Sequence, residues 1–277
     1  MSEERNFQFQ GPRILIKGAG EMASGVALRL FRSGYRILFT ELERPLSIRR
    51  TVSFSECVDR GRWVVEGVHS VRIEKVEEAS KIWNSGGIPL VVDPEGNAFQ
   101  SFRPHVLVDA VLAKRNTGTR IDQADLVIGL GPGFEAGVDV HYVVETDRGH
   151  DLGRVLDRGS ARPRTGRPAI IGGLGEERVL RAPVTGIFQG NRRIGEEIQR
   201  GDRVGQVSSH VVKARCSGLL RGLVRDGLPV FQGRKVGDID PRGSSVDWNR
   251  VSDKALAISG GVLEAILRRF CGVDRVD

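Results

Sequence analysis

Cysteine and histidine are scarce in this sequence, and neither is arranged as in a metal site or a disulfide framework. The chain of 277 residues has three cysteines, Cys57, Cys216 and Cys271, which form no CxxC pair. Its five histidines include no HxH or HxxxH spacing. We therefore expect no disulfide framework, no cysteine zinc site and no protein-bound catalytic metal.

Aromatic residues and long apolar runs are also few. Aromatics make up 6% of the chain, and no apolar run approaches the roughly 20 residues that a membrane helix needs. The net charge is +7, but the basic pairs at 192–193 and 268–269 are short and separate. A nucleic-acid-binding face concentrates its charge and interleaves aromatics, so we expect neither a nucleic-acid partner nor a membrane. The polar, acidic start MSEERNFQFQ is unlike a signal peptide and predicts a cytoplasmic protein.

The first half of the chain alternates apolar runs with segments of helical length. Residues 12–153 therefore predict a Rossmann-like α/β domain with a mostly parallel sheet. Residues 154–178 are rich in Gly, Pro and Arg and predict a linker. We expect helices at 22–33 and 73–84, and strands at 13–17, 35–40, 62–68, 88–93, 105–111, 124–130 and 140–146.

Beyond the linker, residues 179–242 contain an internal repeat of short strands and glycine turns. RAPVTGIF begins at Arg181 and KARCSGLL begins at Lys213, 32 positions later, and several glycines keep the same offset. The repeat predicts a duplicated β-hairpin unit folded into a small all-β barrel. It resembles the barrel-sandwich hybrid of biotinyl and lipoyl domains, which carry a modified lysine in the hairpin between the halves. That hairpin here reads QVSSHVV (206–212), so we expect no biotin or lipoate.

A C-terminal helix is expected over residues 251–271, with Ser252 as its N-cap and Asp253 in its first turn. Apolar residues recur on one face, so we expect the helix to pack on the first domain. Gly260 and Gly261 lie in its middle, where each glycine costs roughly 1 kcal/mol relative to alanine. A closely packed neighbour would explain them.

The turn after the first strand is the clearest candidate for ligand binding. Its residues Gly18, Gly20 and Ala23 fit the G-x-G-x-x-G/A pattern, with Glu21 and Met22 opening the next helix. Such glycines let the backbone approach a pyrophosphate at the helix N-terminus, and an acid at the position of Glu41 binds a ribose hydroxyl. The alternative is a tight turn that needs glycine for packing alone. Glu21 would repel a phosphate unless it points outward.

Polar or glycine-rich loops follow the other expected strands, and parallel strands bring such loops to one edge of a sheet. We expect these loops to converge on one site. Arg44, Arg49 and Arg50 either clamp an anion or form a solvated basic segment. The other candidates are an anion cradle of Lys114, Arg115, Asn116, Thr117, Gly118 and Thr119, a loop open to backbone contact with Gly129, Gly131 and Gly133, and the acid–base candidates Asp147, Arg148 and His150. His150 is alternatively an ordinary hydrogen-bonded loop histidine.

Seven segments spread from Ile14 to about Leu267 together resemble the YqeB family. They are GAGEMASGVALRL, TELERPLSIRRTVSF, DAVLAKRNTGT, IGLGPGFEAGVDV, VETDRGHDLGRV, GDIDPR and SDKALAISGGVLEAIL. YqeB proteins are accessory proteins of selenium-dependent molybdenum hydroxylases, and the first domain is also similar to the Rossmann-type half of XdhC-like maturation factors. The resemblance implies a maturation role, with a molybdenum hydroxylase or its maturation proteins as partners, and it supplies no catalytic residue.

Three functions are compatible with these observations. The first is an accessory factor that binds a phosphate-bearing ligand, either molybdopterin or a nucleotide. The second is an NAD(P)-dependent oxidoreductase that uses the turn at 18–23 and Glu41, and the third is a non-catalytic scaffold with a carrier-like barrel. Cys57 is a further candidate for handling sulfur or selenium, although its acidic flanks would not lower its pKa. The sequence decides neither whether a reaction is catalysed nor whether the chain forms a homo-oligomer.

Overall fold

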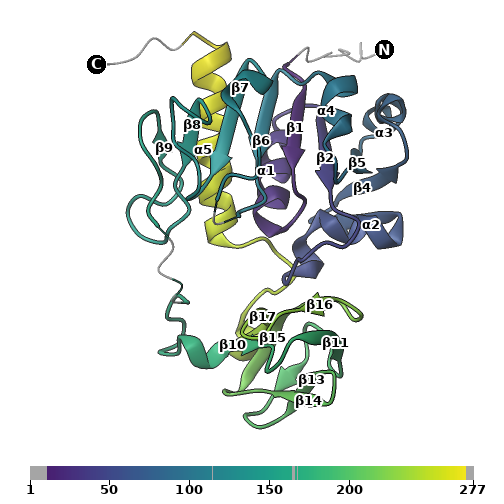
Figure 1. Cartoon of the computed structure of the whole chain (residues 1–277), viewed down its shortest axis with the longest axis vertical. Helices are drawn as coiled ribbons and strands as arrows, with labels where there is room; N and C mark the ends of the chain where they lie inside the picture. Colours follow the sequence, from purple (N-terminus) through teal and green to yellow (C-terminus); the bar gives the residue numbers. More distant parts are fainter. Residues whose placement is uncertain (1–10, 114, 164–165, 167, 273–277) are drawn as a thin grey trace, which may run out of the picture.

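The computed structural model describes residues 11–113, 115–163, 166 and 168–272. Figure 1 shows two units, one above the other. The larger, which we call the α/β unit, contains strands β1 to β9 and all the described α-helices. The smaller, which we call the β unit, contains strands β10 to β17.

The α/β unit is built on a nine-stranded, mostly parallel sheet with the order β3-β4-β5-β2-β1-β6-β7-β8-β9. Neighbours from β4 to β8 pair in parallel, whereas the edge strands β3 and β9 are antiparallel to their neighbours. Because β2 and β6 flank β1 on opposite sides, the strand order reverses at β1. The strands are β1 Ile14–Lys17, β2 Ile37–Glu41, β3 Arg62–Val65, β4 Val68–Ile73, β5 Ile88–Val92, β6 Val106–Asp109, β7 Leu126–Leu130, β8 Tyr142–Val144 and β9 Val155–Leu156.

One expected strand and one expected helix differ from the structure. The run RWVVEGV, expected as a single strand over 62–68, is a hairpin that turns at Glu66 and Gly67, where φ is 46° and 80°. Two consecutive positive φ angles give a turn whose twist matches that of paired strands. The helix expected over 73–84 is shorter: β4 ends at Ile73, a 3-10 turn spans Val76–Glu78, and the α-helix covers only Ala79–Asn84.

Helices cover both faces of the sheet. Strand residues alternate between two apolar cores: Ile14 and Ile16 face the core that contains α1 and α5, whereas Leu15 faces the one that contains α3 and α4. The helices are α1 Glu21–Arg32, α2 Cys57–Arg60, α3 Ala79–Asn84, α4 Asn97–Phe102 and α5 Asp253–Phe270. In the part of the chain that the structure describes, none of them is long and apolar enough to span a membrane.

The C-terminal helix α5 packs against α1, as its apolar face predicts. Ser252 is its N-cap and accepts a hydrogen bond from the amide of Ala255 at 3.3 Å. A Cβ atom on Gly261 would collide with the carbonyl of Gly153, so close packing explains that glycine. The same reason does not apply to Gly260, because no atom outside the helix lies within 4 Å of the position of its Cβ.

The 32-residue offset seen in the sequence also relates the strands of the β unit. β12 Glu197–Ile198 maps onto β16 Pro229–Val230, and β11 Gly186–Gly190 maps onto the start of β15 Gly218–Leu223. The same offset relates β10 Val179–Arg181 to β14 His210–Lys213, and β13 Arg203–Val207 to β17 Lys235–Asp240.

The two copies of the repeat interlock. One antiparallel sheet has the order β10-β17-β15-β12, and the other has the order β14-β13-β11-β16. Exchanging each strand for its counterpart in the other copy converts one order into the other. Each sheet therefore takes two strands from each copy, and neither copy can bury its apolar face alone. Phe188, Ile198, Leu220 and Val236 lie in the shared core.

Hydrogen bonds and ion pairs join the β unit to the loop that follows β2. The amide of Leu223 donates to the carbonyl of Ile48 at 2.9 Å, and Nε of Arg50 donates to the carbonyl of Leu223 at 2.8 Å. Arg225 pairs with the buried Glu56 at 2.6 Å. The β unit consequently lies beyond the carboxyl edge of the large sheet (Figure 1).

Candidate functional site

The glycine turn lies between β1 and α1, at the point where the strand order reverses. Gly18 has a φ of +89°, and its Cβ would lie 3.4 Å from the carbonyl carbon of Ala110, so the turn approaches the end of β6 closely. Gly20 is the N-cap of α1, which begins at Glu21. Met22 and Ala23, the other two members of the motif, are buried in the first turn of the helix. In open α/β sheets this crevice is where ligands bind.

The carboxylate of Glu41 folds back on the glycine turn. Its Oε1 accepts from the amide of Ala19 at 3.1 Å, and its Oε2 accepts from the amide of Leu42 at 2.7 Å. Burial raises the pKa of Glu41, and these two hydrogen bonds oppose that rise. Glu41 thus stabilises the turn itself, a role that is separate from the ribose contact predicted from the sequence.

Next to the turn, the ends of β1 and β6 are joined by an ion pair. Lys17 Nζ lies 3.3 Å from Oδ2 of Asp109, which also accepts from Oγ1 of Thr119 at 2.5 Å. Lys17 also donates to Thr117 at 3.2 Å. Lys17 and Asp109 were not among the residues predicted from the sequence. The signal that could have identified them is a charged residue at the end of an apolar strand.

The segment expected as an anion cradle is held mainly by its own contacts. Oδ1 of Asn116 accepts from the amides of Gly118 and Thr119, at 2.9 and 2.8 Å, and its Nδ2 donates to the carbonyl of Thr119 at 2.7 Å. Arg115 and Thr117 lie in the same loop, and Lys114 lies outside the described residues. Asn116 therefore shapes this loop with its side chain.

At the carboxyl edge, the loop that follows β7 contacts both the loop that follows β6 and the loop that follows β8. A Cβ on Gly133 would lie 3.0 Å from the backbone of Arg115, and a Cβ on Gly131 would lie 2.5 Å from Oγ1 of Thr146. Gly129 similarly makes room for the ring of Phe134. Close packing therefore accounts for all three glycines, and the loops that follow β6, β7 and β8 lie side by side at this edge.

Of the acid–base candidates after β8, the structure places Asp147 and His150 on the exposed surface. The amide of Asp147 donates to the buried carboxylate of Glu145 at 2.7 Å, which fixes the start of the loop. Arg148 reaches across to Asp253 at the start of α5, with hydrogen bonds of 2.8 and 2.9 Å. Those bonds from Arg148 lower the pKa of Asp253 to about 2.

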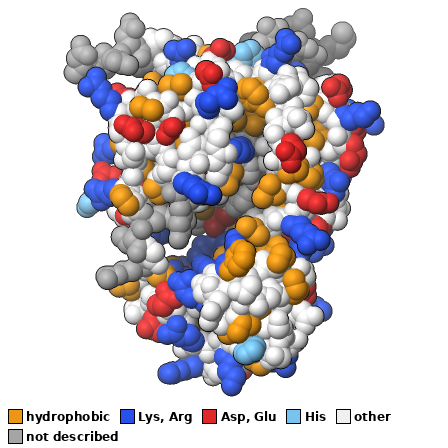
Figure 2. Space-filling view, in the orientation of Figure 1, with side chains coloured by type: hydrophobic (Ala, Val, Ile, Leu, Met, Phe, Trp, Pro, Cys, Tyr) orange, Lys and Arg blue, Asp and Glu red, His pale blue; other side chains and the backbone are white. Residues whose placement is uncertain are grey.

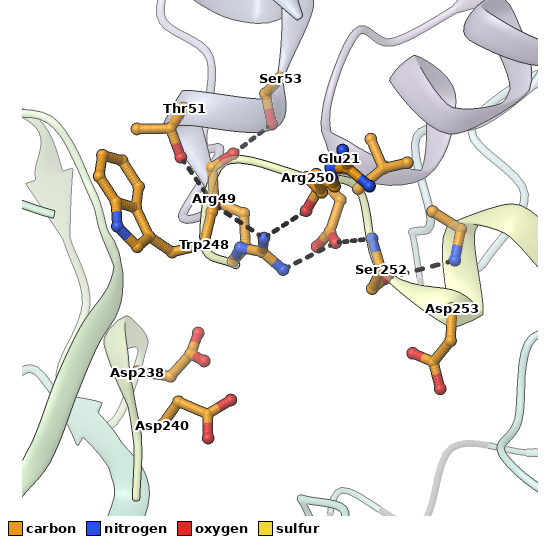
Figure 3. A network of polar contacts seen from close by, with 12 residues as sticks. Glu21, Arg49, Thr51, Ser53, Asp238, Asp240, Trp248, Arg250, Ser252 and Asp253 are labelled. Carbon is orange, nitrogen blue, oxygen red and sulfur yellow. Dashed lines mark hydrogen bonds and ion pairs between the residues drawn. The ribbon is translucent and has the colours of Figure 1, made fainter. Parts of the chain in front are cut away.

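The first residue of α1, Glu21, is neutralised by a buried arginine (Figure 3). Arg49 is only 6% exposed, and its Nη1 donates to Glu21 at 2.9 Å. Its Nη2 donates to the carbonyls of Arg250 and Trp248 at 3.0 and 3.3 Å, and the amide of Ser252 also donates to Glu21. Glu21 therefore points toward Arg49 and the chain before α5. Of the three arginines named from the sequence, Arg49 is buried, Arg50 pairs with Glu56, and Arg44 is exposed.

Facing this network from the β unit are two buried aspartates, Asp238 and Asp240, at the end of β17. Figure 3 shows both aspartates, together with Asp253, on the same side of Arg49. Asp238 pairs with Lys235 at 3.0 Å and with Arg178 at 3.6 Å. Burial alone would raise the pKa of Asp240, but hydrogen bonds from Arg242 outweigh it and lower that pKa.

The space between the units is hollowed and charged. Figure 2 shows acidic and basic side chains inside a hollow between the upper and lower parts of the molecule. Two buried nitrogen atoms in this region, Nε of Arg49 and Nε of Arg221, have no hydrogen-bond partner among the described residues. Arg221, Asp238 and Asp240 were not among the residues predicted from the sequence; the segment GDIDPR, at 237–242, contains the two aspartates but not Arg221.

Two open pockets lie beside this network, and they share Thr51 and Trp63. One has a volume of about 690 Å³ and also contains Trp248, and the other, of about 430 Å³, contains Arg193 and Arg225 from the β unit. Neither is lined by the glycine turn. Open α/β sheets commonly bind ligands at the carboxyl edge where the strand order reverses, which here is the glycine turn.

The remaining sequence candidates for reactive chemistry find little support. Cys57 is fully buried, its Sγ lies 3.3 Å from the carbonyl of Gly61, and burial raises the pKa of its thiol to about 11. A thiol with such a pKa is a poor nucleophile near neutral pH. Within the described ranges, no group of three or more His, Cys, Asp or Glu side chains is arranged to hold a metal ion.

Comparisons with known proteins give one clear relative. No family model matches the chain. The uncharacterized protein YqeB of Escherichia coli K12 is 47% identical over 254 residues, which are 92% of this chain. That similarity supports the resemblance to the YqeB family. The matched residues are 47% of the E. coli protein, so the chain spans about half the length of this relative.

Solved structures give only weak similarities. They include the ectoine utilization protein EutE (DoeB) of Ruegeria pomeroyi, with 10% identity and a TM-score of 0.26. An aspartoacylase family protein of Mesorhizobium loti has 11% identity, and a succinylglutamate desuccinylase/aspartoacylase of Rhodobacter sphaeroides has 10%, each with a TM-score of 0.25. Each comparison covers 83% of this chain and 85% of the other. Scores this low carry no argument about fold or function.

Proposed function

We propose that this protein is an accessory factor in the maturation of a selenium-dependent molybdenum hydroxylase, and that it binds a phosphate-bearing ligand at the carboxyl edge of its sheet. The YqeB resemblance supports the maturation role. The ligand is a molybdopterin or a nucleotide, and the partners are the hydroxylase or its other maturation proteins.

The observation that carries the ligand proposal is the glycine turn at the strand-order reversal. Gly20 caps α1, so the amides of the first helical turn offer donors and partial positive charge to a phosphate. The carboxylate of Glu21, which would otherwise repel an anion there, is neutralised by Arg49 at 2.9 Å. The loops after β6, β7 and β8 lie at the same edge and complete the walls of the site.

A thermal-shift panel tests the proposal with molybdopterin under anaerobic conditions, ADP, NADH and NADPH. A ligand at a hundred times its dissociation constant stabilises the fold by about 2.7 kcal/mol, which is easily measured. Stabilisation by molybdopterin is the expected result. The absence of any shift at millimolar concentrations would reject the ligand proposal and leave a scaffold role.

A matched pair of variants locates the ligand. Gly20→Asp and Gly20→Asn have nearly the same shape, and both residues are good N-caps, so neither should disturb α1. A Cβ at position 20 meets only Oγ of Ser47, at 3.5 Å. If a phosphate lies at this turn, the aspartate variant should bind at least tenfold more weakly than the asparagine variant. Equal affinities would place the ligand elsewhere.

The second candidate function is an NAD(P)-dependent oxidoreductase, and the position of Glu41 favours it. Glu41 ends β2 beside the glycine turn, which is the position of the acid that binds a ribose in dinucleotide-binding folds. Glu41→Gln keeps one carbonyl oxygen to accept a hydrogen bond within the turn. It should weaken NADH binding if this function holds, and it should change molybdopterin binding little.

We further propose that the β unit is of the barrel-sandwich-hybrid type without carrier chemistry. The interlocked pairing of the two repeat copies supports this assignment. The hairpin between the copies turns at Ser208 and Ser209 and contains no lysine between 206 and 212. The intact mass of the purified protein should therefore show neither biotin nor lipoate.

A further inference from the structure

Arg221 lies in β15 of the β unit, among the charged side chains between the two units. Its charge interacts with Asp238 and Asp240 of the same unit, and with Arg49 and Asp253 of the α/β unit. No hydrogen bond or ion pair joins its guanidinium to another described residue, and its Nε is buried without a partner. A guanidinium group has five N–H donors, so Arg221, which is half-buried, has hydrogen-bonding capacity that no described residue uses.

The surrounding carboxylates do not need Arg221 as a partner. Asp238 already pairs with Lys235 and Arg178, Asp240 with Arg242, and Asp253 with Arg148. Glu21 is likewise bound by Arg49. Each carboxylate therefore has its own cation within 4 Å, and Arg221 is a surplus positive charge.

Arg49 adds a second unsatisfied donor to the same region. It is 6% exposed, its three side-chain hydrogen bonds use Nη1 and Nη2, and its Nε has no partner among the described residues. Two like-charged guanidinium groups near each other, each with a buried unpaired N–H, cost free energy in the empty protein. A bound anion would lower this cost, because its negative charge offsets the repulsion between the two guanidinium groups.

We propose that Arg221 and Arg49 together hold a phosphate group of a ligand bound between the two units. The inference rests on the proposed function, because it names the groups that contact the phosphate of that ligand. Arg221 presents its guanidinium fork to two phosphate oxygens, and the positive charge of Arg49 adds to the attraction for the anion. The four carboxylates pair with five cations, and Arg221 is a sixth, so this network has an excess of two positive charges, which matches a phosphate dianion.

The β unit is therefore half of the ligand site. Arg221 comes from β15 and Arg49 from the loop after β2, and these segments are already joined by the hydrogen bonds between Leu223, Ile48 and Arg50. Binding a phosphate between them would also tie the two units more firmly together. A chain lacking either unit would bind the ligand poorly.

Isothermal titration with inorganic phosphate and pyrophosphate tests the assignment in the full chain. Arg221→Gln should weaken phosphate binding about tenfold or more, because a charge-assisted contact is lost. Arg221→Lys should bind with intermediate affinity, since it keeps the charge but loses the fork. Arg200→Gln removes the same charge from an exposed position of the β unit and should bind phosphate as the wild type does.

The unfolding temperature without ligand separates a binding role from a structural one. If Arg221 exists to hold a ligand, Arg221→Gln should be at least as stable as the wild type, because repulsion with Arg49 is relieved. If it exists to balance the buried carboxylates, the variant should unfold several degrees lower while binding phosphate like the Arg200→Gln control. That result would overturn the inference, as would a wild type that does not bind millimolar phosphate or pyrophosphate.

The same variants separate this inference from the proposed function. Molybdopterin or nucleotide binding that survives Arg221→Gln but fails in Gly20→Asp would keep the proposed function and reject the role of Arg221. Phosphate binding that depends on Arg221, in a protein that binds neither molybdopterin nor any nucleotide, would support the anion site and reject the proposed ligand class.

Discussion

Replacing Arg49 should cost the protein much of its stability, because this side chain joins three segments from a buried position. Its guanidinium bonds Glu21 at the start of α1 and the carbonyls of Trp248 and Arg250 before α5. Removing one partner of a buried ion pair typically costs about 3–5 kcal/mol. Glu21 is 16% exposed and keeps the hydrogen bond from the amide of Ser252, so we expect Arg49→Met to fall near the lower end, at about 3 kcal/mol.

Urea unfolding followed by tryptophan fluorescence measures this loss, with Arg44→Met as the control because Arg44 is exposed. The double variant Glu21→Gln/Arg49→Met should lose clearly less than the sum of the two single losses, since it leaves no unpaired buried charge. A loss below about 1 kcal/mol for Arg49→Met, or fully additive losses, would refute the view that this buried pair holds the start of α1 to the start of α5.

Three further predictions follow from packing and pKa. A Cβ on Gly25 would lie 2.7 Å from the Cβ of Ala255, so Gly25→Ala should lower the free energy of unfolding by about 1–3 kcal/mol. Gly260→Ala, whose new Cβ meets no neighbour, should raise the free energy of unfolding by up to about 1 kcal/mol. A higher urea midpoint for Gly25→Ala than for Gly260→Ala would contradict the packing of α1 against α5. The pKa of Asp253 is lowered from 3.8 to about 2 by Arg148, so its stabilising effect should be present above pH 3.8 and lost as pH falls toward 2. The urea midpoint of Asp253→Asn should accordingly fall less than that of the wild type between pH 3.8 and pH 2. The same fall in both proteins would contradict a stabilising role of the pair between Arg148 and Asp253. Cys57 is buried with a raised pKa, whereas Cys271 is exposed, so a thiol reagent should modify Cys271 rapidly and Cys57 only on unfolding.

Local patterns predicted the elements of the α/β unit well, because strands buried on both faces leave apolar runs that stand out in any sequence. Where the prediction of 62–68 was wrong, the turn at Glu66 and Gly67 lies inside an otherwise continuous apolar stretch. The hairpin depends on positive φ angles at both positions. Glycine adopts such angles readily but glutamate rarely does, so Glu66 gave no sign of the turn.

The repeat was visible because duplication leaves a constant offset between glycines. How the strands of the two copies pair is a long-range property. The 32-residue offset alone does not predict that each sheet takes strands from both copies. The pairing orders of the two sheets supply that information.

The candidate site was predictable only in part, for a similar reason. Glycine turns and loops after strands are local features, and the structure places them at one edge of the sheet. The charged network depends on tertiary contacts: the pairing of β15 with β17 brings Arg221 near Asp240, and Arg49 joins them because the β unit folds against the loop after β2. Asn116 and Glu41 were predicted to contact a ligand. In the structure, their side chains accept hydrogen bonds from the backbone of nearby loops and hold those loops in shape.

The central claim is that a phosphate-bearing ligand binds between the carboxyl edge of the sheet and the β unit. Hydrogen–deuterium exchange, measured with and without millimolar pyrophosphate and then with molybdopterin, tests it most directly. We predict slower exchange in two separate peptides, one covering Gly18–Met22 and one covering Gly218–Leu223. Protection confined to segments away from both, or no change in either with any of these ligands, would contradict the account.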